Sequence, residues 1–308
     1  MKLHWRARAV LGGLVWASLS QQAFAQDLEP RRWSHLPVGM SVVAAGYSYT
    51  EGDLAFDPVL ELEDVEFKMH AAIVSYMHAF ALAGTSARVD IAVPYVHEAR
   101  WTGQLEGAPA STERAGLADP LIRLSVHLYG GPPLKGQEYL SYRREHPVHT
   151  SVGAAIAVTL PVGEYESDKL INLGNNRFSI RPQIGVLHTR GPWSYELTGS
   201  AFLYTENDDF FGGSKLEQDP IYALQAHLVR TFKPGWWAAC GGAYGWGGRA
   251  TIDGLKKDNK KIDVLLGASF GMPLTKSQGV KLAYVRTRTM ESAGADSDSL
   301  ILGWSLRF

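Results

Sequence analysis

Residues 88–95, Arg-Val-Asp-Ile-Ala-Val-Pro-Tyr, decide the fold class of this chain. Apolar side chains alternate here with charged or small ones, at Val89, Ile91, Val93 and Tyr95. Successive side chains of a β-strand point to opposite faces of the sheet. The period of two therefore predicts a strand with one apolar and one polar face.

The same alternation recurs along the rest of the chain. It is clearest at 85–97, 120–129, 150–161, 193–205, 220–232 and 300–308. It is compatible but less regular at 38–50, 66–81, 177–189, 236–249, 262–273 and 279–290. These segments make about twelve strands, each near the roughly 9–11 residues that a tilted strand needs to cross an outer membrane.

The connections between these segments alternate in length. Short turns fall at 83–85, 190–192, 233–235 and 273–278. Longer polar segments fall at 51–65, 98–118, 162–176, 206–219, 250–261 and 291–297. Short turns on one side and long loops on the other are typical of outer-membrane barrels. The sequence therefore predicts an all-β fold, a transmembrane antiparallel up-and-down β-barrel.

One connection departs from this rule. Residues 130–149 begin with Gly-Gly-Pro-Pro, continue through a charged stretch to His149, and fall on the short-turn side. Two interpretations are open for this possible periplasmic insertion, a helix in the periplasm or a plug-like element.

The first 25 residues have the features of a secretory signal peptide. Lys2, Arg6 and Arg8 precede an apolar stretch over 9–19, and Ala-Phe-Ala at 23–25 forms a small-x-small cleavage site. We expect cleavage before Gln26 and a single barrel domain over 26–308. Loss of the leader removes three basic residues and leaves 27 basic and 31 acidic ones, a net charge of −4.

The aromatic residues and the C-terminus support a membrane location. Tyr and Trp prefer the membrane–water interface, and many lie near predicted strand ends: Tyr95, Tyr129, Tyr195, Tyr204, Tyr222, Phe232, Trp236, Trp237, Tyr244, Trp246, Trp304 and Phe308. The last strand alternates and ends in Phe308, which resembles the signal read by outer-membrane assembly machinery. We therefore expect the outer membrane of a Gram-negative bacterium, with its lipid and lipopolysaccharide as partners.

Composition excludes several other classes of protein. The formal charge of −1 gives no basic excess, so no nucleic-acid partner is expected. Cys240 is the single cysteine, which excludes an intramolecular disulfide and a cysteine-based zinc site. No motif predicts catalytic, cofactor-binding or metal-ligating residues, so we expect no enzyme and no cofactor.

Short motifs along the chain resemble a known family. They are 88–95, Gly-Leu-Ala-Asp-Pro at 116–120, Leu-Pro-Val-Gly-Glu-Tyr at 160–165, Arg-Pro-Gln at 181–183 and the ending Trp304 to Phe308. Over about 40–308 the chain resembles the outer-membrane proteins named for the MetA (meta-cleavage) pathway of phenol degradation. The resemblance implies a barrel transporter for small aromatic hydrocarbons or similar compounds.

The polar faces of the strands supply candidate lumen-lining residues. These are Arg88, Asp90, Arg123, His127, Arg181, Gln183, Glu196, Gln225 and His227. In a pore, rings of charge set selectivity, and the three arginines could attract carboxylates or phenolates. In a closed barrel, the same charges pair across the lumen and fill it. Both interpretations remain open.

Two other functions compete with a small-molecule channel. A structural or surface-recognition barrel could bind divalent ions through carboxylate-rich loops at 53–64, 164–168 and 206–209, although none has EF-hand spacing. An outer-membrane acyl hydrolase needs a serine–histidine pair with an orienting partner. No serine motif is present, and His127 and His227 alternate inward, which makes the hydrolase the weakest alternative.

Overall fold

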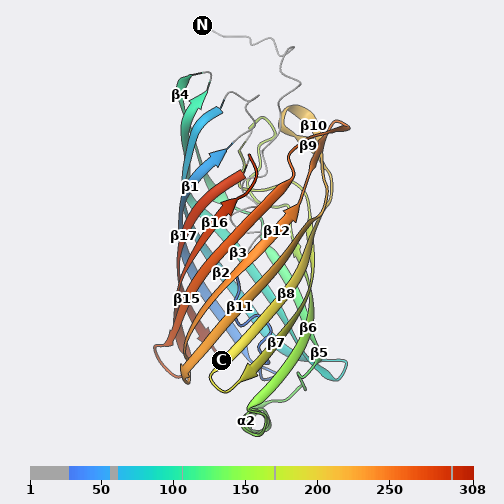
Figure 1. Cartoon of the computed structure of the whole chain (residues 1–308), viewed down its shortest axis with the longest axis vertical. Coiled ribbons are helices and arrows are strands. Elements are labelled where there is room, and N and C mark those ends of the chain that lie inside the picture. Colours follow the sequence, from blue (N-terminus) through green and yellow to red (C-terminus); the bar gives the residue numbers. More distant parts are fainter. Residues whose placement is uncertain (1–27, 56–61, 106, 170, 293) are drawn as a thin grey trace.

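A closed antiparallel barrel forms the body of the protein in the computed structural model (Figure 1). The structure describes residues 28–55, 62–105, 107–169, 171–292 and 294–308. The predicted leader, 1–25, lies outside the described residues. Among those that are described, no helix is both long and apolar enough to span a membrane.

Twelve antiparallel strands close the wall. They are β1 (Ser41–Ala55), β2 (Leu62–Leu82), β3 (Thr85–Leu105), β4 (Ala108–Leu117) followed in line by β5 (Leu121–Tyr129), β6 (Val148–Thr159), β7 (Ser179–Arg190), β8 (Trp193–Tyr204), β11 (Ile221–Lys233), β12 (Trp236–Gly247), β15 (Lys261–Pro273), β16 (Gln278–Thr289) and β17 (Gly294–Arg307). β4 and β5 pair with successive parts of β3 and together count as one strand. β1 pairs with β17, which closes the barrel without a free edge.

The predicted barrel is confirmed, and each alternating segment forms a strand. Parts of the predicted long loops are strands instead. β2 and β3 each run for 21 residues, past the length needed to cross a membrane. Two segments predicted as loops form a separate four-stranded sheet from β9 (Asn207–Phe210), β10 (Ser214–Gln218), β13 (Ala250–Ile252) and β14 (Leu255–Lys256). These strands are short and polar, so their alternation is too weak to read from sequence.

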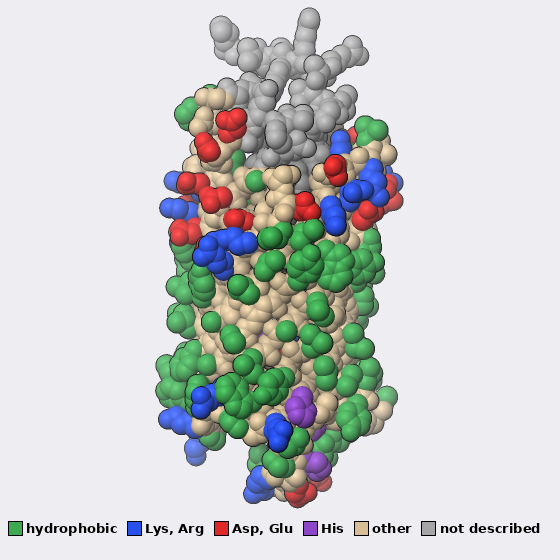
Figure 2. All heavy atoms as spheres, viewed as in Figure 1, with side chains coloured by type: hydrophobic (Ala, Val, Ile, Leu, Met, Phe, Trp, Pro, Cys, Tyr) green, Lys and Arg blue, Asp and Glu red, His purple; other side chains and the backbone are tan. Residues whose placement is uncertain are grey.

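An apolar belt covers the barrel between its two charged ends on the face that Figure 2 shows. Its side chains come from every second position of the strands, and Leu128, Ile184 and Leu266 are 61%, 57% and 60% exposed. Such a surface is stable against lipid and costly against water. Tyr204 and Trp237 depart from the predicted interfacial set. Arginines of the interior lie over both rings, Arg177 over Tyr204 and Arg31 over Trp237.

The two ends of the barrel differ, and we name them by their connections. The turn end carries the short turns, Phe308 and the 130–149 connection, which contains helix α2 (Gly136–Glu145) (Figure 1). The loop end carries the second sheet and the ends of β3 and β4. Phe308 is tied into the wall, since its N–H donates to the Ser41 carbonyl at 3.0 Å and its carbonyl accepts from Ser41 N–H at 2.9 Å.

Candidate functional site

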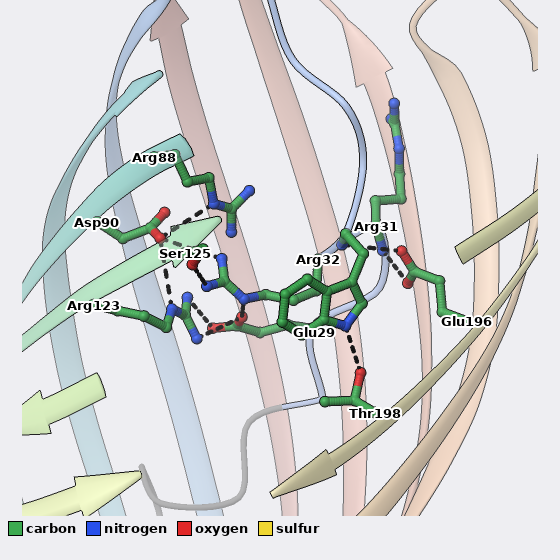
Figure 3. Close-up of polar contacts among 10 residues, drawn as sticks. Glu29, Arg31, Arg32, Arg88, Asp90, Arg123, Ser125, Glu196 and Thr198 are labelled. Carbon is green, nitrogen blue, oxygen red and sulfur yellow. Dashed lines mark hydrogen bonds and ion pairs between the residues drawn. The ribbon is translucent and has the colours of Figure 1, made fainter. Parts of the chain in front are cut away.

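The chain that precedes β1 runs through the interior of the barrel (Figure 3). We call residues 28–37 the plug segment. It includes one turn over residues 30–33, and its polar groups bind side chains of β3, β5, β6 and β8. These partners lie 58 to 165 residues away in sequence. The residues that bind the plug segment therefore come together only when the barrel closes.

Ion pairs hold the first part of the plug segment against β3 and β5. Glu29 binds Arg123 with Oε2 to Nη1 at 2.9 Å and Oε1 to Nη2 at 3.0 Å. Arg32 binds Asp90 at 3.2 Å and donates to Ser125 Oγ. Asp90 also accepts from Arg88 at 3.2 Å. The charges of the plug segment and of the wall therefore compensate each other in one network.

The protonation of Glu29 reflects this network. Burial alone would raise the pKa of its carboxyl, but the charge and hydrogen bond of Arg123, together with Arg181 and Arg88, lower the pKa from 4.5 to about 2. Glu29 is thus an anion at neutral pH. The Glu29 side chain is 33% exposed and that of Arg123 is 6% exposed, so the pair is partly buried.

A turn in the plug segment is fixed by Glu196 of β8. Arg31 has a φ of +68°, in the left-handed region that non-glycine residues rarely adopt. Its N–H donates to Glu196 Oε2, and the N–H of Trp33 donates to Oε1 at 3.4 Å. One carboxylate of the wall therefore accepts both backbone donors of the turn.

Trp33 is anchored in a socket between β6 and β7. Gly153 and Gly185 are direct cross-strand partners, and the indole lies against both. Its Nε1–H donates to Thr198 Oγ1 at 2.7 Å, and its carbonyl accepts from Ser151 Oγ at 3.2 Å. Trp33 is 2% exposed. Paired glycines at inward positions leave the room that the ring fills.

The turn end of the plug segment packs on the 130–149 connection. His35 Nε2 donates to the Pro132 carbonyl at 2.8 Å, and Tyr139 of α2 donates to the His35 carbonyl at 2.9 Å. Burial, together with the charges of His127, His149 and Arg143, lowers the pKa of His35 from 6.5 to about 4, against the Pro132 hydrogen bond, which raises it. The 130–149 connection thus binds the turn end of the plug segment on two sides of His35.

An apolar cluster fills the loop end of the interior. It brings Phe67 and Trp101 of β2 and β3 against Leu173 of the 160–178 connection, with Phe210 and Ile252 from the second sheet. Each of these side chains is at most 7% exposed. The interior therefore changes along its axis, from apolar at the loop end to charged around Glu29.

The predicted lumen-lining residues lie around the plug segment. Six of the nine are buried, namely Arg123, Arg181, Gln183, Glu196, Gln225 and His227. Arg88, Asp90 and Arg123 meet in the Glu29 network, while Glu196 holds the turn. His127 Nε2 lies 3.3 Å from the Trp33 carbonyl, and Arg181 lies over Phe202 at 5.1 Å. Gln225 pairs across strands with Thr198, His227 with Glu196, and Gln183 with Ser200.

The plug segment itself has no pattern that predicts it from the sequence. Glu29, Arg31, Arg32, Trp33 and His35 have no alternation and follow directly on the predicted leader. One signal was available, since Gly153 and Gly185 stand at inward positions of otherwise regular strands. Glycine at such a position indicates close approach of another group.

The described residues give little support to two alternative chemistries, metal binding and acyl hydrolysis. Within them, no group of three or more His, Cys, Asp or Glu side chains could hold a metal ion. Ser41 Oγ and His78 Nδ1 lie 2.9 Å apart, which is within reach for a serine–histidine pair. Ser41 is 6% exposed, and in the described chain no hydrogen bond or ion pair joins His78 to a carboxylate.

Comparisons with known proteins agree with this architecture. A family model described as "Putative MetA-pathway of phenol degradation" matches residues 57–294. The COG4313 outer membrane channel from Pseudomonas putida F1 is 21% identical with a TM-score of 0.75, covering 92% of this chain and 100% of that one. This likeness shows a shared barrel fold.

Two autotransporter barrels are more distant. The transport unit of AIDA-I from Escherichia coli has a TM-score of 0.47 at 10% identity, covering 95% of this chain and 96% of that one. The translocator domain of NalP from Neisseria meningitidis has a TM-score of 0.45 at 10% identity, covering 90% and 91%. No curated protein matches the chain.

Proposed function

The chain belongs to the family described as "Putative MetA-pathway of phenol degradation", and from this premise we propose that it is an outer-membrane channel for small, uncharged, phenol-like compounds. The supporting observation is the seated plug segment. Glu29, Arg32 and Trp33 occupy the interior and bind the wall, which leaves little room for a large solute. A channel of this form selects by size before it selects by charge.

The apolar cluster at the loop end supports the choice of permeant. Phe67, Trp101 and Leu173 close this end with apolar surface. A compound with an aromatic ring loses less on entering such a region than a sugar does, because unpaired hydroxyls are costly to bury. The family name fits the same class of compound.

We further propose that Arg88, Asp90, Arg123 and Glu196 act first as the seat of the plug segment. Their partners are Glu29, Arg32 and the Arg31 turn. Arg181 contributes to the same field, since its charge lowers the pKa of Glu29. In this role the arginines fix the plug segment and do not form an open ring for anions.

The orientation in the membrane is part of the proposal. The turn end faces the periplasm, and the 130–149 connection with α2 is a periplasmic insertion that clasps the plug segment. The leader is cleaved after Ala25, so that the mature chain begins just before the plug segment. Phe308 is read by the assembly machinery, and the apolar belt contacts outer-membrane lipid and lipopolysaccharide.

Liposome swelling with purified protein tests the channel against its main rival, a closed structural barrel. We expect swelling in a pentose and none in a trisaccharide, because the plug segment leaves a narrow passage. A variant that lacks residues 28–36 should admit both solutes. Failure of the parent to admit the pentose, together with no contribution of the chain to phenol uptake by cells, would favour the closed barrel, which the ion pairs of Glu29 also fit.

A chromogenic acyl ester tests the hydrolase alternative. We propose that the barrel has no hydrolytic activity, because Ser41 is buried and its pairing with His78 is structural. Hydrolysis by the parent that disappears in Ser41→Ala would contradict this.

A further inference from the structure

The interior surfaces of the two sides of the barrel differ in exposure. We call β5 to β8 and β11 the seated wall, and β16, β17, β1 and β2 the open wall. On the seated wall the inward positions at mid-barrel are buried, as at Ser125, Ser151 and Thr198. On the open wall several inward positions are partly exposed, as at Ser48 and Ser299, although Ala71, the cross-strand partner of Ser48, and Ala283 are buried.

The contacts of the plug segment explain this difference. In the described chain, its side-chain hydrogen bonds and ion pairs reach β3, the seated wall and the 130–149 connection. Arg31 also lies over Trp237 of β12, and Leu28 approaches Gly267 of β15. Among the described residues, the backbone hydrogen bonds from the chain before β1 to the open wall lie at the turn end, where Gly39 N–H donates to the Ala79 carbonyl of β2.

The open wall carries small or aliphatic side chains along its inward face. The partly exposed ones include Ala44, Gly46, Ser48, Ile73, Ser75, Val285, Ser299, Ile301, Gly303 and Ser305, whereas Thr50, Ala71, Ala79 and Ala283 are buried. Among the described inward positions of these four strands, the charged ones are Lys281 and Arg307, both at the turn end. A passage along this wall is therefore neutral through the middle of the barrel and cationic at its turn end.

Hydroxyl groups mark the inner end of the apolar cluster. Thr50 Oγ1 and Ser299 Oγ lie 2.9 Å apart, and either can donate. Thr50 is 7% exposed, whereas Ser299 is partly exposed. A partly exposed hydroxyl can exchange its bond for one to a passing solute at little cost, because one hydrogen bond replaces another.

We propose that the permeant moves along the open wall, between the plug segment and strands β16, β17, β1 and β2, in contact with Ser48, Ser75 and Ser299. The substrate class is a small uncharged molecule with an apolar body and one hydroxyl or similar polar group. This inference rests on the proposed channel function and names the residues that carry it. Under it the plug segment stays seated during passage.

Cysteine labelling distinguishes the two walls. The native Cys240 is exposed and is first replaced by serine. Ser48→Cys and Ser299→Cys then report on the open wall, while Ser125→Cys is the matched control, an inward serine of the seated wall that accepts a hydrogen bond from Arg32. The probe is N-ethylmaleimide, an uncharged reagent of about the size of phenol. Heat-modifiable electrophoretic mobility shows that each variant is folded.

We expect Ser48→Cys and Ser299→Cys to react at least about tenfold faster than Ser125→Cys, because thiol reactivity follows access. Equal rates at the two walls, or faster reaction at Ser125→Cys, would overturn the proposal. The labelling does not depend on phenol transport. Rapid labelling without phenol uptake would support the path along the open wall and refute the proposed channel function. Phenol uptake without rapid labelling would support the channel function and refute the path along the open wall.

Discussion

The indole of Trp33 occupies the space that a side chain at Gly185 would fill. A Cβ at position 185 would lie 2.0 Å from Nε1 and 2.3 Å from Cε2 of the ring. Nε1 is the atom that donates to Thr198. The absence of a side chain at Gly185 therefore allows the Trp33 indole of the plug segment to bind the wall.

Gly185→Ala should unseat Trp33 without breaking the barrel. The new methyl overlaps a ring held by backbone on both sides, and overpacking of this kind costs about 1–3 kcal/mol. We expect higher single-channel conductance in planar bilayers and a lower melting temperature. Gly199→Ala is the matched control, because a Cβ there meets nothing closer than Ile184 Cγ2 at 4.0 Å. An unchanged conductance in Gly185→Ala would count against the socket.

Glu29→Gln should loosen the other end of the plug segment. The change removes the anion that compensates Arg123, and because Glu29 is 33% exposed the cost lies between about 1 kcal/mol for an exposed pair and about 3–5 kcal/mol for a buried one. The expected result is frequent opening events in single-channel records. Glu113→Gln is the control, because its pair with Arg100 is exposed and worth about 0–1 kcal/mol. Equal effects of the two variants would show that Glu29 does not seat the plug segment.

Seating of the plug segment should weaken as the pH falls. The pKa of His35 is about 4 when seated, below its ordinary value of 6.5. The released segment thus binds more protons between these values, so the stability of seating is fully present above pH 6.5 and declines towards pH 4. Glu29, with a pKa of about 2 against 4.5, contributes a further loss below pH 4.5.

Among the groups that face His35, the charges of His127, His149 and Arg143 also oppose its protonation, whereas its hydrogen bond to the Pro132 carbonyl favours it. The rings of His127 and His149 lie 5.8 and 6.3 Å from it, and those of Tyr139 and Tyr142 lie 5.1 and 5.8 Å away. Conductance should rise as the pH falls from 6.5 to 4. His35→Gln should flatten this rise, whereas the exposed His97→Gln should not. If conductance still rises as the pH falls in His35→Gln, a group other than His35 causes the pH dependence.

The wall of the barrel was predictable because its signal is local. Val89, Ile91 and Val93 alternate within one strand, and lipid on one side enforces that pattern. The plug segment gave no such signal. Trp33 meets Thr198 across 165 residues, and a turn held by Glu196 has no periodicity of its own. Sequence could therefore name Arg88, Asp90 and Arg123 as inward, but it could not name the Glu29 network in which they meet.

The 130–149 connection illustrates the same limit. Its length set it apart from the other turns, but its polar helix has no buried residue of its own. Its contact with the plug segment is made by Pro132 and Tyr139, which meet His35 about 100 residues upstream. Only the closed barrel brings these parts together.

Uptake by whole cells tests the central claim that the chain passes small uncharged aromatic compounds across the outer membrane. Initial rates for radiolabelled phenol and benzoate are compared in a deletion strain, with and without the restored parent chain. The two compounds are similar in size, but benzoate is an anion at neutral pH. We predict that the parent restores uptake of phenol and has little effect on benzoate, because the open wall is neutral at mid-barrel. Equal phenol uptake with and without the chain would contradict the account.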